Sequence, residues 1–165
     1  MSVLNMVGAG DAGNRKENDF YPTLHWGTQA LLVLEKFDGI IWEPACGDGA
    51  MSEVLKSNGY EVISSDKFNY GYEIVGEQDF LTSEDEPKVD NIVTNPPFKL
   101  GQEFVEKALK VAKKKVAMLL RIQFVEGQKR QPWLFTTPLK YVYVFGKRLN
   151  FNDSGGTTLC FAWFV

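Results

Sequence analysis

The sequence predicts a single α/β domain whose sheet is mainly parallel and has helices on both faces. Short apolar segments alternate with segments whose apolar residues recur at helical spacing, which is the pattern of βαβ units. The last two strand-like segments leave no room for a helix between them, so we expect an antiparallel pair at the end of the sheet. The length of 165 residues fits one domain of ordinary size.

The first half of the chain supplies three strands and two helices after a polar start. Residues 1–18 are small and polar, and we expect a flexible N-terminal arm. Helical spacing and short apolar runs predict the elements that follow. They are a helix at 26–37, a strand at 40–42, a helix at 51–58, a strand at 60–64 and a shorter strand at 78–81.

The second half continues the alternation and closes with the strand pair. The segment 116–122 is nearly all apolar, as expected for the middle of a sheet covered on both faces. The other expected elements are a strand at 91–94, an amphipathic helix at 104–112, a short helix at 128–135 and strands at 141–145 and 158–165.

The composition limits the classes of function. The net charge of -3 argues against a strong nonspecific nucleic-acid binder, but residues 1–100 carry -10 and residues 101–165 carry +7. This asymmetry indicates that one face of the protein binds a polyanion. Lysines 113–115 could equally lie at the carboxyl end of a helix, where the helix dipole favours cations. Two distant cysteines and one histidine predict no metal site. The absence of a long apolar run predicts no membrane span and a cytoplasmic protein.

Two glycine-rich segments are candidates for a nucleotide site. Residues 8–13 match G-x-G-x-x-G, but no strand precedes them and no amphipathic helix follows. Residues 43–49 instead follow a buried strand and precede an amphipathic helix, at the edge where open α/β sheets bind ligands. Gly47 and Gly49 let the backbone approach a ligand closely.

The charges beside the second segment favour a cationic ligand. Asp66, at the end of the next strand, is placed to accept hydrogen bonds from ribose hydroxyls. Glu43 and Asp48 would repel a pyrophosphate, yet they suit an ammonium and a sulfonium. The sequence therefore favours S-adenosylmethionine over a dinucleotide, although Asp48 could simply cap the helix.

The tetrapeptide Asn95-Pro96-Pro97-Phe98 follows the strand at 91–94 and is the predicted reactive centre. Two prolines make a stiff turn that projects carbonyl groups and the Asn95 amide. The Asn95 oxygen and the Pro96 carbonyl can hold both hydrogens of an exocyclic amine and aim its lone pair at a methyl group. Phe98 would stack on the base, which must be flipped out of a duplex.

These motifs resemble a known family. The order EPACGDG, Asp66, Asp79-Phe80 and NPPF resembles the class I amino-methyltransferases of DNA, and most closely the small bacteriophage-type DNA N6-adenine methyltransferases. The resemblance covers residues 19–165 and implies a catalytic domain with a Rossmann-like sheet of seven strands, the last antiparallel. The segments DFYPT at 19–23, FVEG at 124–127, KRLNF at 147–151 and the closing AWFV also resemble phage members.

The resemblance implies roles for individual residues. Phe20 and Thr23 would line the methionine end of S-adenosylmethionine, Asp66 would bind its ribose, and Asp79 and Phe80 would contact its adenine. The full expected cofactor set is Phe20, Thr23, Glu43, Pro44, Ala45, Cys46, Gly47, Asp66, Lys67, Asp79 and Phe80. Phosphates near the site would be contacted by Lys129, Arg130, Lys147 and Arg148.

The expected activity is methyl transfer to adenine N6 in DNA. No stretch is long enough for a separate target-recognition domain, so a partner protein could guide the enzyme to its target. A small enzyme that acts on duplex DNA could also work as a homodimer. A phage origin would place the protein in the bacterial host cytoplasm. RNA guanine N2 or adenine N6, glutamine in a protein, and a non-catalytic cofactor-binding module remain the alternatives.

Overall fold

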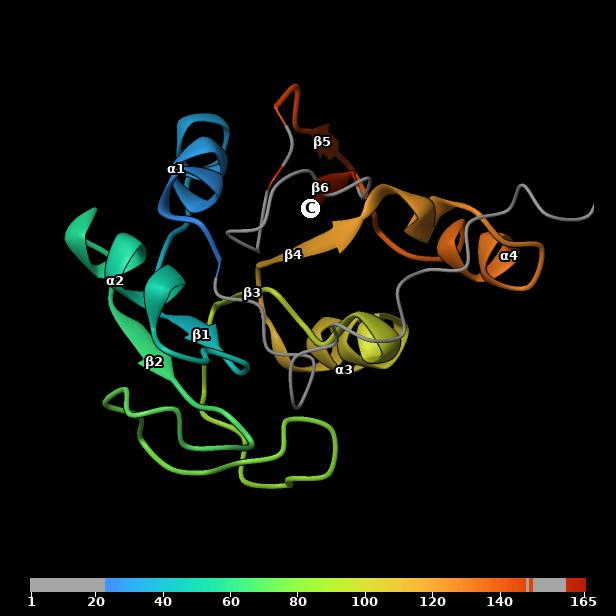
Figure 1. Cartoon of the computed structure of the whole chain (residues 1–165). Coiled ribbons are helices and arrows are strands. Elements are labelled where there is room, and N and C mark those ends of the chain that lie inside the picture. Colours follow the sequence, from blue (N-terminus) through green and yellow to red (C-terminus); the bar gives the residue numbers. More distant parts are fainter. Residues whose placement is uncertain (1–22, 148, 150–159) are drawn as a thin grey trace, which may run out of the picture.

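The protein is an α/β domain built on one twisted sheet (Figure 1). The computed structural model describes residues 23–147, 149 and 160–165. Six strands lie within these residues, in the order β2-β1-β3-β4-β6-β5. Their bounds are Ile41–Glu43 (β1), Val62–Ser64 (β2), Asn91–Thr94 (β3), Lys115–Arg121 (β4), Val142–Val144 (β5) and Phe161–Phe164 (β6).

The strand directions confirm the predicted topology. Strands β2, β1, β3 and β4 are parallel to one another, whereas β6 runs antiparallel to both β4 and β5. Met118 of β4 lies opposite Phe164, and Arg121 lies opposite Phe161. The single reversed strand therefore lies between β4 and the edge strand β5.

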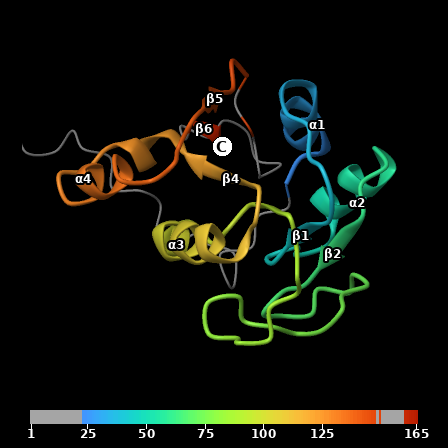
Figure 2. The ribbon, with the colours of Figure 1, turned by 180° about the vertical axis from the view of Figure 1, so that it is seen from behind.

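Helices cover both faces of the sheet, as the sequence predicts. Helices α1 and α2 lie together on one side, and α3 lies on the other (Figures 1 and 2). A 3-10 turn, η2, follows β3. A second 3-10 turn, η3, and a short helix, α4, follow β4. Their bounds are His25–Leu34 (α1), Ala50–Ser57 (α2), Phe98–Leu100 (η2), Gly101–Val111 (α3), Ile122–Val125 (η3) and Arg130–Leu134 (α4).

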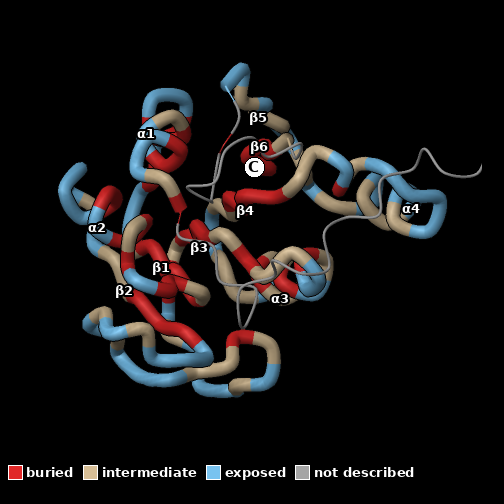
Figure 3. Tube along the Cα trace, in the orientation of Figure 1, coloured by how far each residue is buried: buried red, intermediate tan, exposed pale blue. Residues whose placement is uncertain are grey.

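The alternation of side chains along β4 produces two separate cores. Ala117 and Leu119 pack toward α1 and α2, whereas Met118 and Leu120 pack toward α3. Because successive residues of a strand point to opposite faces, a nearly continuous apolar strand indicates a sheet buried on both sides. Figure 3 shows this burial along the central strands.

Two sequence expectations about elements are wrong. Residues 78–81 do not form a strand: an isolated parallel bridge joins Asp66 and Glu77. The chain turns at Asp79 instead, because its side chain accepts a hydrogen bond from the Leu81 amide and its carbonyl accepts one from Ser83. The seven-stranded sheet is therefore a six-stranded one in the described residues. Helix α1 ends at Leu34, before the expected residue 37.

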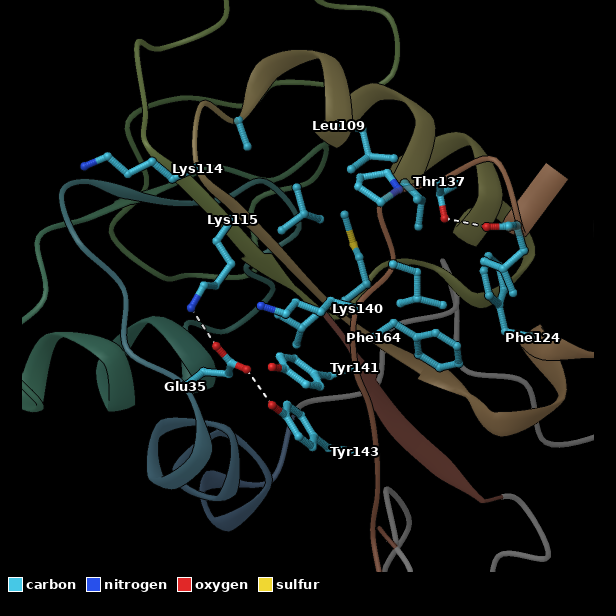
Figure 4. A pocket seen from close by; sticks show the side chains of 18 of the residues that line it. Glu35, Leu109, Lys114, Lys115, Phe124, Thr137, Lys140, Tyr141, Tyr143 and Phe164 are labelled. Carbon is cyan, nitrogen blue, oxygen red and sulfur yellow. Dashed lines mark hydrogen bonds and ion pairs between the residues drawn. The ribbon is translucent and has the colours of Figure 1, made fainter.

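The early end of α1 places Glu35 in a buried ion-pair network. Its carboxylate accepts hydrogen bonds from Lys115 Nζ at 2.6 Å and from the Tyr143 hydroxyl at 2.6 Å (Figure 4). Burial raises the pKa of Glu35, but these two bonds outweigh it and leave the pKa below its ordinary value of 4.5. The network therefore ties the end of α1 to the first residue of β4 and to β5.

Removing the cation of this network tests its contribution. We expect Lys115→Met to lower the free energy of unfolding by about 1–2 kcal/mol, because it leaves a buried carboxylate without its charged partner while the partial exposure of Lys115 limits the loss. Urea unfolding at pH 7 measures the change.

The same network predicts a pH dependence. Ionised Glu35 stabilises the fold above pH 4.5, the ordinary pKa of the group, and this stabilisation is lost as the pH falls through the lowered pKa of Glu35 in the folded protein. The difference between variant and wild type should therefore shrink in acid.

The matched control is Lys110→Met in the last turn of α3, where the lysine is exposed. Equal losses for the two variants would contradict a specific role of the Glu35 network.

Candidate active site

The carboxyl ends of β1, β2 and β3 meet at one edge of the sheet (Figure 1). Strand β1 pairs in parallel with both neighbours, with Glu43 opposite Ser64 and Trp42 opposite Ile92. The segments that follow these strands therefore emerge side by side. This pairing brings the glycine-rich loop after β1, the segment around Asp66 and the turn at Asn95 to the same edge.

The glycine-rich loop continues the pairing beyond β1. The Ser65 amide donates to the Glu43 carbonyl at 3.0 Å, and the Cys46 amide donates to the Ser65 carbonyl at 3.1 Å. Gly47 and Gly49 then adopt φ of 54° and 82°, the left-handed region in which a side chain is costly. These two glycines turn the chain into helix α2 at the place the sequence predicts.

Asp66 fixes this loop from the neighbouring strand. Its carboxylate is 8% exposed and accepts hydrogen bonds from the Gly47 amide at 2.9 Å and the Phe68 amide at 3.0 Å. Burial raises the pKa of Asp66 in spite of these bonds. Each carboxylate oxygen can accept more than one hydrogen bond, so the group can support the loop and still accept from a ligand.

Glu43 lies beneath the loop. Its side chain is buried and accepts a hydrogen bond from the Ser52 hydroxyl of α2. The Ser52 hydroxyl also lies 2.6 Å from the Ser64 hydroxyl of β2. Burial raises the pKa of Glu43 well above its ordinary range. Glu43 therefore joins β1, β2 and α2, a supporting role that the sequence interpretation did not include.

Three further residues of the loop, all predicted to contact the cofactor, are largely shielded from solvent. Cys46 is buried, and its burial, followed by the nearby carboxylates of Glu43 and Asp66, raises its pKa to about 12. A thiol in this state is a poor nucleophile. Pro44 is buried and Ala45 half-buried beside it. Within the described residues, no cluster of His, Cys, Asp and Glu could hold a metal ion.

Asn95 is joined to the start of the described chain. Its Nδ2 donates to the Thr23 hydroxyl at 3.1 Å, across 72 positions of sequence, and Thr23 is 7% exposed. The structure thus brings together two residues that the sequence assigned separately to the cofactor and to the target. This contact fixes the rotation of the Asn95 amide.

The turn after Asn95 is closed and its aromatic ring is held. Pro97 has an extended backbone, and its carbonyl accepts from the Leu100 amide at 2.9 Å. The Phe98 ring lies 5.2 Å from the Phe161 ring and 4.6 Å from the Arg121 guanidinium. Sequence reasoning missed Arg121, for which the signal was a lone charge near the end of an otherwise apolar strand.

The segment after β2 carries three further residues predicted to contact the cofactor. Lys67 Nζ lies 2.9 Å from the Asp79 carboxylate, and this bond keeps the pKa of Asp79 below its ordinary value. The Phe80 ring is 2% exposed and packs against Trp42 and Phe104 at 5.1 and 4.9 Å. Phe80 therefore belongs to the core, and the contact of its ring with a cofactor stays a prediction.

The predicted phosphate-binding residues fall in two places. Lys129 and Arg130 lie at the start of α4, whereas Lys147 lies 5.9 Å from the Trp26 ring of α1. Helices α1 and α4 lie on either side of β4 and β6 (Figures 1 and 2). The predicted residues Phe20 and Arg148, and the arm at 1–18, lie outside the described residues.

A mostly apolar cavity lies away from this edge and is not needed to define the site. It measures about 570 Å³ and is bounded by α3, by the amino half of β4 and by the segment that leads into β5 (Figure 4). Because β3 and β4 are parallel, the amino half of β4 is at the opposite end of the sheet from Asn95. The size of this cavity therefore does not identify the candidate active site.

Comparison with solved structures identifies the fold. No family model and no curated protein matches the chain. The 23S rRNA methyltransferase ErmE has a TM-score of 0.64 at 15% identity over 88% of this chain and 68% of its own. A dimethyladenosine transferase from Plasmodium falciparum has a TM-score of 0.59 at 16% identity over 88% of this chain. An S-adenosylmethionine-dependent O-methyltransferase from Thermotoga maritima has a TM-score of 0.55 at 17% identity over 84% of this chain.

The chain has the fold of the S-adenosylmethionine-dependent methyltransferases. It spans 62% of the length of both the Plasmodium and the Thermotoga proteins. In the described part of the chain, no helix is long and apolar enough to cross a membrane.

A substitution in the glycine-rich loop tests its close packing. A Cβ at Gly49 would lie 2.2 Å from the Tyr72 ring, whereas a Cβ at Gly59, with φ of 87°, would meet nothing within 4 Å. Both Gly→Ala variants should lose about 1 kcal/mol through the left-handed backbone. We expect Gly49→Ala to lose measurably more, because Tyr72 must leave its hydrogen bonds with Glu53 and Lys56. Thermal unfolding of the two variants measures the difference, and equal losses would show that the loop is not closely packed.

Proposed function

We propose that the protein transfers a methyl group from S-adenosylmethionine to the exocyclic amine of a nucleic-acid base. The observation that carries this proposal is the position of Asn95 at the end of β3, beside the Gly47 loop at the end of β1. One edge of the sheet thus presents a backbone loop suited to a nucleoside and an oriented amide suited to an amine. The likeness to an rRNA methyltransferase and a dimethyladenosine transferase supports the choice of substrate class.

The loop fits the proposed cofactor in shape and in charge. The backbone at Gly47 can approach a ligand closely, and Asp66 retains acceptor capacity for a ribose hydroxyl. Asp48 is exposed beside the loop and adds negative charge, although it also accepts from the Ala50 amide at the start of α2. When bound, S-adenosylmethionine supplies an electrophilic methyl group on a sulfonium. A loop with acidic neighbours suits this cation better than a pyrophosphate.

The turn residues would act by positioning. The Asn95 oxygen and the Pro96 carbonyl would accept the two hydrogens of the target amine, which directs its lone pair toward the methyl group. Thr23 holds the Asn95 amide in the required rotation. No strong base is needed before attack, because the proton of the amine can leave after the methyl group has been transferred.

Adenine N6 in DNA is the favoured target. The support is the order of motifs from Asp19 to Val165, which resembles the small phage DNA N6-adenine methyltransferases and would place the protein in a bacterial host cytoplasm. RNA is the second candidate, because the solved structures with this fold include a 23S rRNA methyltransferase. A homodimer or a guiding partner protein could supply target recognition to either activity.

Substitution of Asn95 tests the proposed chemistry. We expect Asn95→Ala to lower kcat by about 10²–10³-fold, as when one oriented hydrogen-bonding group is lost from other active sites. The measurement is transfer of labelled methyl groups to DNA and to RNA, followed by identification of the modified nucleoside. Asn58→Ala, an exposed position at the end of α2, is the control. Unchanged transfer by Asn95→Ala would contradict the assigned role, and no transfer by the wild type to any nucleic acid would contradict the function.

Substitution of Asp66 tests the cofactor site separately. We expect Asp66→Asn to weaken S-adenosylmethionine binding about tenfold or more, because the amide nitrogen cannot accept from one of the two backbone N–H groups. Calorimetric titration with S-adenosylmethionine measures the dissociation constant. Asp38→Asn is the matched control, since Asp38 is 91% exposed at the opposite end of the sheet. An unchanged dissociation constant for Asp66→Asn would remove Asp66 from the cofactor site.

A further inference from the structure

A polar hollow lies beside the Asn-Pro-Pro-Phe turn and includes Arg130, one of the residues that the sequence resemblance assigns to phosphate contacts. It measures about 210 Å³ and is bounded by Phe98, by the start of α3, by the end of β4 and by the start of α4. Its polar lining consists of Lys99, Gln102, Glu103, Arg121, Gln123 and Arg130. Small-molecule sites usually begin at about 300 Å³, so the hollow suits one functional group better than a whole nucleoside.

The two arginines of the hollow are held in place by aromatic rings. The Arg121 guanidinium lies 4.6 Å from the Phe98 ring centroid, and the Arg130 guanidinium lies 4.6 Å from the Phe124 ring centroid. Arg130 Nη1 also donates to the Phe124 carbonyl at 3.4 Å. Each cation covers one face of its ring and is held there by the cation–π attraction.

The described residues give the lining of the hollow a net positive charge. Neither Arg121 nor Arg130 forms an ion pair there, and the Nε atoms of both are buried without a hydrogen-bond partner in that part of the chain. Glu103 is the one carboxylate in the lining, and it is exposed. Arg121 and Arg130 are both partly exposed, and the fork of N–H donors on a guanidinium matches the oxygens of a phosphate.

We propose that this hollow binds the phosphodiester group next to the target base. The proposal rests on the proposed function, because it takes the Asn-Pro-Pro-Phe turn as the place where the base is held. Phe98 belongs both to that turn and to the wall of the hollow, so a nucleotide whose base reaches Asn95 has its backbone close to Arg121 and Arg130. The hollow thereby gives the proposed enzyme a substrate contact that does not depend on base sequence.

Salt-dependent binding of a 20-nucleotide single-stranded DNA, followed by fluorescence anisotropy, tests the site. We expect Arg130→Gln and Arg121→Gln each to weaken binding about tenfold and to reduce the slope of log K against log salt by about 0.7. Arg130→Lys should retain the wild-type slope because it keeps the charge. Glu103→Gln should tighten binding, because it removes the one negative charge in the lining.

Lys110→Gln, at the far end of α3, is the matched control and should leave both affinity and slope unchanged. Thermal unfolding and calorimetric titration with S-adenosylmethionine verify that each variant is folded and retains its cofactor affinity. Slopes for Arg130→Gln and Arg121→Gln equal to that of the wild type would overturn the proposal.

A neutral methylphosphonate locates the contact. In an oligonucleotide with a single adenine, replacement of the phosphate on one side of that adenine should weaken wild-type binding at least as much as Arg130→Gln does. The two changes together should cost less than the sum of their separate losses. Additive losses at both flanking phosphates would overturn the proposal.

The outcomes separate this site from the proposed function. If the wild type transfers methyl groups but the arginine variants keep the wild-type slope of log K against log salt, the phosphate site is rejected and the proposed function is retained. If the arginine variants reduce that slope but the wild type transfers no methyl group to any nucleic acid, the proposed function is rejected and the phosphate site is retained.

Discussion

The hydrogen bond from the Gly47 amide to the Asp66 carboxylate is the constraint on which the arrangement of the edge depends. It joins the loop after β1 to the segment after β2 across a buried interface, where an unpaired carboxylate would be costly. The bonds between Ser65, Glu43 and Cys46 extend the same parallel pairing beyond the strands. Together they hold the backbone at Gly47 in a shape that a ligand can approach without first ordering the loop.

A second set of contacts fixes the turn beside this loop. Asn95 bonds to Thr23, and the Phe98 ring lies against Phe161 and Arg121. These partners come from the start of the described chain, from β6 and from β4, so the turn is supported by elements distant in sequence. An active site that works by positioning requires such rigidity, because small displacements of the reacting groups cost large factors in rate.

The charge asymmetry of the sequence has a counterpart in space. Asp48 and Asp66 lie at the loop at the end of β1, whereas Arg121 and Arg130 line the hollow beyond the turn. A cationic cofactor and an anionic substrate would each meet the opposite charge, with the turn at Asn95 between them. The hollow that this arrangement uses measures about 210 Å³, less than the 570 Å³ of the apolar cavity at the other end of the sheet, and its assignment rests on its charge and position.

The sequence by itself determined the parallel sheet, the reversed last strand, the helices on both faces and the position of the two turns, because apolar periodicity and Gly or Pro act over a few neighbouring residues. It could not determine that Phe80 turns into the core, that residues 78–81 leave the sheet, or that Glu43 bonds to Ser52. It also could not place Arg121 against Phe98 or Thr23 against Asn95. Those outcomes depend on which distant side chains fill the same space and satisfy the same hydrogen bonds, and only the packed tertiary structure decides that competition.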